Sequence, residues 1–117
     1  SLNCEIWLSL DDYMHGKVYD IMKALEKRKR IPILLLLKEK KKLKLADFLE
    51  IIPKKTGSGS SGTIGEALKE LTNLGLVRTV VRDEGKGWVD YELTELGKKV
   101  ADKIAEIIEV AKRSGHR

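Results

Sequence analysis

The sequence has little that would suit a secreted or membrane-spanning protein. Its one cysteine, Cys4, cannot form an internal disulfide, which indicates a reducing compartment. The longest uninterrupted apolar run, residues 31–37, is far shorter than the roughly 20 residues that a membrane-spanning helix needs. The first residues do not show the basic segment and apolar stretch of a signal peptide. We therefore expect a soluble, cytoplasmic protein with no membrane partner.

Groups that carry catalysis or bind metals are also scarce. The two histidines, His15 and His116, are isolated, and Cys4 has no partner at the spacing of metal ligands. No nucleophile, base and acid can be assembled into a catalytic arrangement. The glycine-serine segment 57–63 is similar to a phosphate-binding loop but lacks the lysine that should follow its last glycine. We expect no metal, no cofactor and no enzymatic activity.

Aromatic residues make up only 5% of the 117 residues, so the core must be aliphatic, and 42% hydrophobic content is enough to form one. Charged residues reach 35%, and a composition rich in Lys and Glu is typical of heat-adapted organisms. The net charge of +5 is uneven, because residues 27–55 hold eleven Lys and Arg against three Asp and Glu. This basic segment favours a polyanionic partner, although a solvated lysine-rich surface is the alternative.

The chain length predicts one domain, residues 1–117, with a core at 31–93 and a helix on either side. In the first outer helix, residues 9–29, Ser9 is the expected N-cap and apolar residues recur at spacings of three and four. The second, residues 95–113, follows Thr94 as N-cap and has nearly heptad spacing. Both apolar stripes are longer than a small core can cover.

The middle of the chain predicts three helices. Residues 32–40 are apolar nearly all round, so this helix should be central. Residues 45–52 should form a helix that ends at Pro53, and Leu43 suits a short strand before it. A flexible glycine-serine turn, 53–62, then leads to helix 61–74, which Ser60 or Ser61 caps and Gly75 ends.

Residues 76–93 predict a β-hairpin. Two β-rich segments, 76–81 and 88–93, flank a charged tip at 82–87 that contains two glycines. Three helices followed by a hairpin are typical of a winged helix-turn-helix. The fold class is therefore mostly α with a small β-hairpin wing, and with extra N- and C-terminal helices.

Two motifs carry a family resemblance. The first is Leu68-Lys69-Glu70-Leu71 followed by Gly75-Leu76-Val77, and the second is the string 89–97, which contains Tyr91, Leu93, Thr94 and Gly97. Over about residues 31–100 the sequence resembles the winged helix-turn-helix transcriptional regulators, and the broad MarR, PadR and HxlR-like group fits best. The resemblance implies a dimeric DNA-binding regulator, usually a repressor and sometimes ligand-responsive. No effector-sensing residue can be transferred.

In this interpretation helix 61–74 is the recognition helix, whose N-terminus reaches the major groove of duplex DNA. Glu66 and Glu70 should lie on its exposed side, and no arginine is present for guanine contacts. Trp88 is expected to pack on the domain. The candidate DNA contacts are Lys54, Lys55, Ser58, Ser60, Ser61, Thr63, Glu66, Lys69, Arg82 and Lys86.

The outer helices are expected to bury their stripes in a homodimer. The alternative is that they pack on each other within one chain. The candidate interface residues are Leu10, Met14, Ile21, Leu96, Val100, Ile104, Ile107, Ile108 and Ala111. The acidic recognition helix leaves a second function open, which is a protein-interaction module without direct DNA contact.

Overall fold

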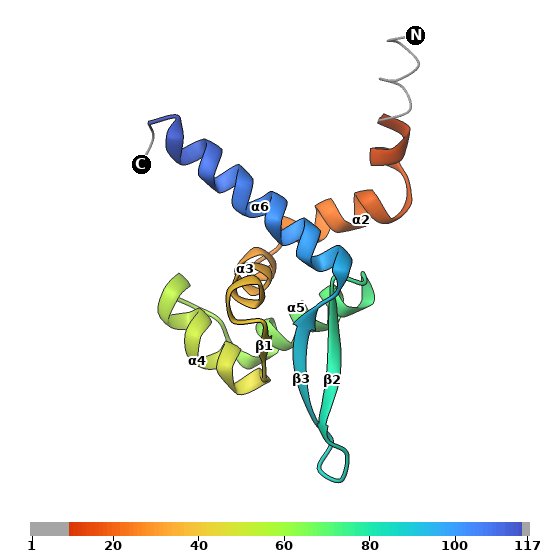
Figure 1. Ribbon diagram of the computed structural model, residues 1–117, viewed down its shortest axis with the longest axis vertical. Coiled ribbons are helices and arrows are strands. Elements are labelled where there is room, and N and C mark those ends of the chain that lie inside the picture. The colour runs from red at the N-terminus through yellow and green to blue at the C-terminus, as the bar shows by residue number, and fades with distance from the viewer. Residues whose placement is uncertain (1–9, 116–117) are drawn as a thin grey trace.

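The computed structural model describes residues 10–115. Three helices, α3 (Arg30–Lys40), α4 (Leu45–Thr56) and α5 (Ser61–Asn73), pack around one core with a small antiparallel sheet of order β1-β3-β2. The strands are β1 (Lys42–Leu43), β2 (Val77–Asp83) and β3 (Trp88–Leu93). The predicted fold class, including the short strand at Leu43, is confirmed, and the hairpin extends away from the body as a wing (Figure 1).

The core is aliphatic apart from Phe48, as the composition predicts. Ile33, Leu34 and Leu37 place α3 at its centre, since all three are fully buried. Other fully buried side chains come from α4, α5 and the start of β2: Phe48, Ile64, Leu68, Leu71, Leu76 and Val77. The outer helix α6 (Glu95–Arg113) contributes Ala101 and Ile104, so its first half belongs to the same core.

The N-terminal helix is not the continuous 9–29 element that the sequence predicts. Residues 10–14 are helical, His15 is extended, and Gly16 takes a left-handed φ of 67°, after which α2 runs over Gly16–Leu25. Apolar periodicity does not reveal the break, because apolar residues recur at helical spacing both before and after it. The predicted cap Ser9, Cys4 and His116 lie outside the described residues.

Pro53 does not end the third helix, which was the expectation. It lies inside α4, which continues to Thr56 and ends at Gly57 with a left-handed φ of 86°. A proline removes one backbone donor, and here the loss falls near the helix end, where the Thr56 hydroxyl also donates to the Ile52 carbonyl at 2.9 Å. The flexible turn is therefore shorter than predicted.

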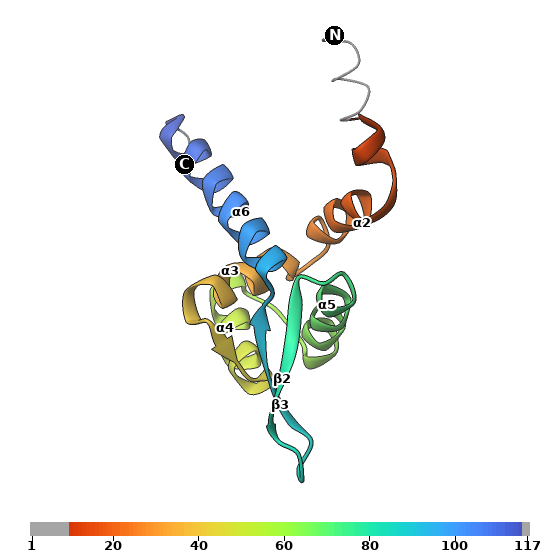
Figure 2. The same ribbon diagram turned by 45° about the vertical axis from the view of Figure 1, so that its right-hand side comes forward.

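The outer helices α2 and α6 leave the body on the side away from the wing tip and diverge from each other (Figure 1, Figure 2). The alternative in which they pack along each other within one chain is therefore wrong. The start of α6 is instead fixed to the start of β2. Thr94 donates from its hydroxyl to the Gly75 carbonyl at 2.6 Å and from its backbone N–H to the Leu76 carbonyl at 3.1 Å.

Candidate nucleic-acid interface

The predicted recognition helix, α5, has one face open to solvent. Ile64, Ala67, Leu68 and Leu71 are buried, and the exposed residues of the opposite stripe are Gly62, Glu66, Lys69 and Asn73. The Ser60 cap is confirmed, because its hydroxyl accepts the Thr63 N–H at 3.2 Å. The side chains of Ser60 and Thr63 are also 3.1 Å apart, so these two hydroxyls hold the helix start, while Ser61 is simply exposed.

Glu70 is not on the open face, contrary to expectation. Its carboxylate accepts hydrogen bonds from Lys27 Nζ at 2.8 Å and from Arg30 Nε at 3.0 Å. Hydrogen bonding from Lys27 is the main cause that lowers the pKa of Glu70, against an opposing effect of burial, and Arg30 lowers it further. Two cations therefore neutralise this carboxylate, which removes much of the acidity predicted for the helix.

Arg30 is the only buried charged residue in the described part of the chain, at 4% exposure. Besides Glu70 it lies 3.6 Å from Glu66, and its guanidinium donates to the Arg28 carbonyl at 2.9 Å. Glu66 itself keeps 79% of its side chain exposed. Of the two predicted acidic residues, only Glu66 is thus presented to a partner.

The turn that leads into α5 is held by Lys29, which sequence patterns did not identify as important. Lys29 Nζ donates to Thr56 Oγ1 at 2.8 Å and to Ser58 Oγ at 3.0 Å. Ser58 was a candidate DNA contact, and the structure places it in this hydrogen-bonded turn. Lys29 has a left-handed φ of 70° at the start of α3. Its contacts with Thr56 and Ser58 join segments that are far apart in the sequence, which is why local patterns do not reveal them.

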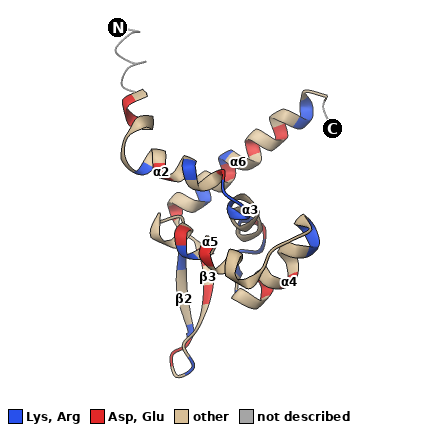
Figure 3. Ribbon diagram, turned by 180° about the vertical axis from the view of Figure 1, so that it is seen from behind, with Lys and Arg blue, Asp and Glu red and all other residues tan. Residues whose placement is uncertain are grey.

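Lys54 and Lys55 lie in the last turn of α4 rather than in a loop. Seen from behind, this turn is the end of α4 that lies farther from the wing (Figure 3). Lys54 is 75% exposed and only 3.9 Å from Glu50 across one helical turn, a spacing that stabilises little. Both lysines are exposed, just before the turn that leads to the recognition helix.

A surface hollow of about 230 Å³ lies between α5 and the sheet. Lys69 and Asn73 line its α5 side, and Thr79 and Tyr91 line its sheet side. Asn73 follows Lys69 by four residues, a spacing that places both on one helix face. This spacing would have identified Asn73 as a further candidate contact. Thr79 could not have been selected from the sequence, because its place beside α5 depends on the register between β2 and β3.

The wing differs from expectation in two residues. Arg82 lies in β2, next to an irregularity between Val81 and Asp83, rather than in the tip, and its guanidinium pairs with Asp90 at 3.1 Å. Trp88 does not pack on the domain. It is 47% exposed, and both Arg82 and Lys86 lie over its ring.

The candidate dimer residues divide into two groups. Ile104 belongs to the core at 8% exposure, and Ile21 and Val100 pack against that core, so these three side chains are used within the chain. The remaining ones are exposed: Leu10, Met14, Leu96, Ile107, Ile108 and Ala111. Beyond Ile104 the apolar stripe of α6 is exposed to solvent, with Ile107 at 67% exposure.

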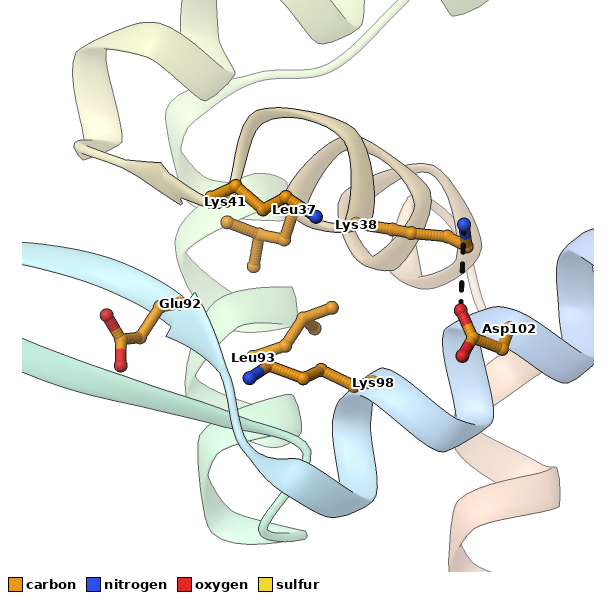
Figure 4. A pocket seen from close by; sticks show the side chains of 7 residues that line it. All are labelled: Leu37, Lys38, Lys41, Glu92, Leu93, Lys98 and Asp102. Atoms are coloured by element: carbon orange, nitrogen blue, oxygen red, sulfur yellow. Dashed lines mark ion pairs between the residues drawn. The ribbon is translucent and has the colours of Figure 1, made fainter.

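A wider cleft lies on another side, where α3, β3 and the start of α6 meet. It has a volume of about 320 Å³ and a floor of Leu37 and Leu93 (Figure 4). Lys38 reaches Asp102 across it at 3.6 Å. The pKa of the neighbouring Glu92 is lowered, mainly by the hydrogen bond from Arg78. The acids here are paired with lysine and arginine, and the cleft helps join α6 to the body.

The family comparison decides the identity of this arrangement. Residues 24–117 match the HxlR-like helix-turn-helix family. The chain belongs to this family. It is therefore a DNA-binding transcriptional regulator of the winged-helix type, as the two sequence motifs predicted. A comparison with curated proteins gives no match.

Solved structures agree on the fold. The reduced transcriptional regulator YodB from Bacillus subtilis is 22% identical with a TM-score of 0.64, covering 85% of this chain and 92% of that one. The putative regulator ytfH from Salmonella typhimurium is 24% identical with a TM-score of 0.64, and 80% of each chain is covered. ZitR from Lactococcus lactis is 26% identical with a TM-score of 0.60, covering 97% of this chain and 77% of that one.

Two further observations bear on partners. Within residues 10–115, no helix combines the length and the apolar character needed to cross a bilayer. Over the same residues, no group of three or more acidic, histidine or cysteine side chains could hold a metal ion. The regulators that this chain is similar to give no support to an enzymatic role.

Proposed function

We propose that this HxlR-like regulator represses transcription as a cytoplasmic homodimer that binds duplex DNA through α5 and the wing. The observation that carries the proposal is the open stripe of α5, which presents Glu66, Lys69 and Asn73, and of which Lys69 and Asn73 line the hollow between α5 and the sheet. A helix of this kind reaches base edges in the major groove, and the hairpin reaches the flanking backbone.

The charges around α5 support this proposal. Lys27 and Arg30 neutralise Glu70, so the main electrostatic argument against DNA contact is removed. Lys69 on α5 and Lys54 and Lys55 in the last turn of α4 are exposed and add positive charge to the two helices that flank the turn 57–60. These side chains neutralise phosphates without reading sequence.

Base reading falls to a small set of side chains in this proposal. Ser61 and Thr63 lie at the start of α5, where its free backbone N–H groups also point outward. Glu66 lies one turn further and can accept a hydrogen bond from a cytosine amino group. Replacing Glu66 with Gln should shift the preference at one base pair from cytosine towards adenine.

Fluorescence anisotropy with random duplex DNA over a range of salt concentrations tests the proposal. We expect Lys54→Ala combined with Lys55→Ala to weaken binding similarly on all sequences and to reduce the salt slope by about two. Ser61→Ala should instead weaken binding to a selected cognate site more than to random DNA. Salt-insensitive or absent binding of the wild type would refute the proposal and favour the protein-interaction module.

The solvent-exposed apolar residues in the second half of α6 support the proposed dimer. Ile107 and Ile108 are exposed on one helix, and full burial of such a side chain stabilises by about 1.5–3 kcal/mol. In a two-fold dimer each substitution acts twice, so Ile107→Glu should raise the dimer Kd by more than about 100-fold. Sedimentation measures this change. Lys99→Glu, on the exposed surface of the same helix, is the control and should stay dimeric. A monomeric wild type would contradict the dimer.

A further inference from the structure

The wing carries an exposed tryptophan flanked by two cations. Trp88, the first residue of β3, is 47% exposed and is not part of the core. The Lys86 ammonium lies 4.4 Å from its ring centroid, and the Arg82 guanidinium carbon lies 5.1 Å from it. Both distances are within the range of a cation–π interaction.

The two cations are held differently. Arg82 is also anchored by Asp90 at 3.1 Å. Lys86 has no carboxylate within 4.0 Å among the described residues, so its ammonium is held only by the indole. Its backbone is fixed by the turn, where the Lys86 N–H donates to the Asp83 carbonyl at 3.2 Å. Trp88 is therefore the common contact of both side chains.

The net charge of the wing does not by itself explain how the wing would bind DNA. The two acidic residues of the tip, Asp83 and Glu84, cancel the charge of Arg82 and Lys86. With no net charge to attract a phosphate, the position of each cation decides whether the contact forms. Lysine and arginine lose much rotamer freedom when they are ordered, and a partner that orders them beforehand lowers that cost on binding.

We propose that Trp88 is the positioning residue of the wing, and that its indole holds Lys86 and Arg82 in place for two DNA phosphates. This inference rests on the proposed DNA-binding function. Trp88 acts through the two cations and does not itself contact the nucleic acid. The wing meets the backbone with its cations already in place.

The test uses the full chain with Trp7→Phe, which leaves Trp88 as the single tryptophan for spectroscopy. In anisotropy titrations with random duplex, Trp88→Ala should lower affinity about threefold to tenfold and reduce the salt slope by one to two. Trp88→Phe, which keeps an aromatic face, should recover most of both. In a background of Arg82→Ala with Lys86→Ala, the alanine change at Trp88 should cost less than twofold.

Two results would overturn the positioning role. If Trp88→Ala costs the same in the double-alanine background, the indole contacts DNA directly. If Trp88→Ala keeps wild-type affinity and salt slope, the wing cations need no positioning. Circular dichroism and the denaturation midpoint should not change in any of these variants, because Trp88 lies outside the core.

A measurement without DNA separates this inference from the proposed function. A nearby ammonium attracts iodide, so Lys86→Ala should reduce iodide quenching of Trp88 fluorescence while acrylamide quenching stays unchanged or increases. Lys103→Ala, on α6, is the control and should change neither. Reduced quenching together with absent DNA binding would refute the proposed function and retain the Trp88–Lys86 pair. Unchanged iodide quenching would refute the pair itself.

Discussion

Replacing Gly97 with Ala should strongly destabilise this protein. A Cβ atom at Gly97 would lie 1.9 Å from the carbonyl oxygen of Leu76 and 2.9 Å from its carbonyl carbon. Neither is the end of a flexible side chain, so the backbones of α6 and β2 would have to separate by about 1 Å or more.

The magnitude follows from what that separation breaks. The Thr94 N–H bond to the Leu76 carbonyl and the Thr94 hydroxyl bond to the Gly75 carbonyl both cross this junction. Each contributes about 1 kcal/mol, and overpacking adds about 1–3 kcal/mol. We expect a loss of about 3–5 kcal/mol in the free energy of unfolding, which is a large share of the total for a domain of this size.

Denaturant unfolding at one fixed protein concentration measures this loss. The matched control is Gly65→Ala, because Gly65 also lies in a helix but has open space where a Cβ would be added. That change should stabilise by up to about 1 kcal/mol, since alanine is the better helix former. A Gly97→Ala protein within about 1 kcal/mol of wild type would show that the close approach of α6 and β2 is not part of the folded state.

Two further predictions concern the body of the protein. Glu70→Gln should cost about 1 kcal/mol at pH 7 because it removes the closer of the two carboxylates that pair with the buried Arg30. Since the folded-state pKa of Glu70 is lowered, its contribution is present above the ordinary glutamate pKa and is lost as pH falls through the folded value. The gap between variant and wild-type midpoints should therefore narrow as the pH falls below the ordinary glutamate pKa, whereas a constant gap would contradict the ion pair. Lys41→Gly should stabilise by about 1 kcal/mol in thermal unfolding because Lys41 has a φ of 75°, while Lys40→Gly, at the last residue of α3, should destabilise slightly. Destabilisation by both changes would argue against strain at Lys41.

Local signals in the sequence were enough to predict most helices and strands. Ser60 and Thr94 as N-caps and Gly75 as the end of α5 are each confirmed, because each acts within a few residues of its own position. Pro53 was interpreted wrongly, and the break at Gly16 was missed, for the complementary reason. Whether a proline ends a helix, or a glycine breaks one, depends on which hydrogen bonds the rest of the fold can supply.

The candidate site was less predictable than the fold. Arg30 and Glu70 lie 40 residues apart in sequence, so nothing local shows that they pair. The same holds for Lys29 and Ser58, which lie 29 residues apart. Sequence patterns therefore identified which residues belong to α5 and the wing. Pairing across the fold decided which of their charges remain available to a partner.

These pairings also connect the proposed DNA surface to the proposed dimer. Thr94 fixes the start of α6 to Gly75 and Leu76, just before the wing strand β2, and Arg30, the first residue of α3, fixes the segment after α2 to α5. Each outer helix is thus joined by short polar contacts to one of the two elements of the proposed DNA surface, or to the segment next to it. In a two-fold dimer built on the outer helices, the arrangement of α6 against its partner would set the separation of the two wings and recognition helices. A separation of about 34 Å, one turn of DNA, would place both α5 helices in successive major grooves on one face of the duplex.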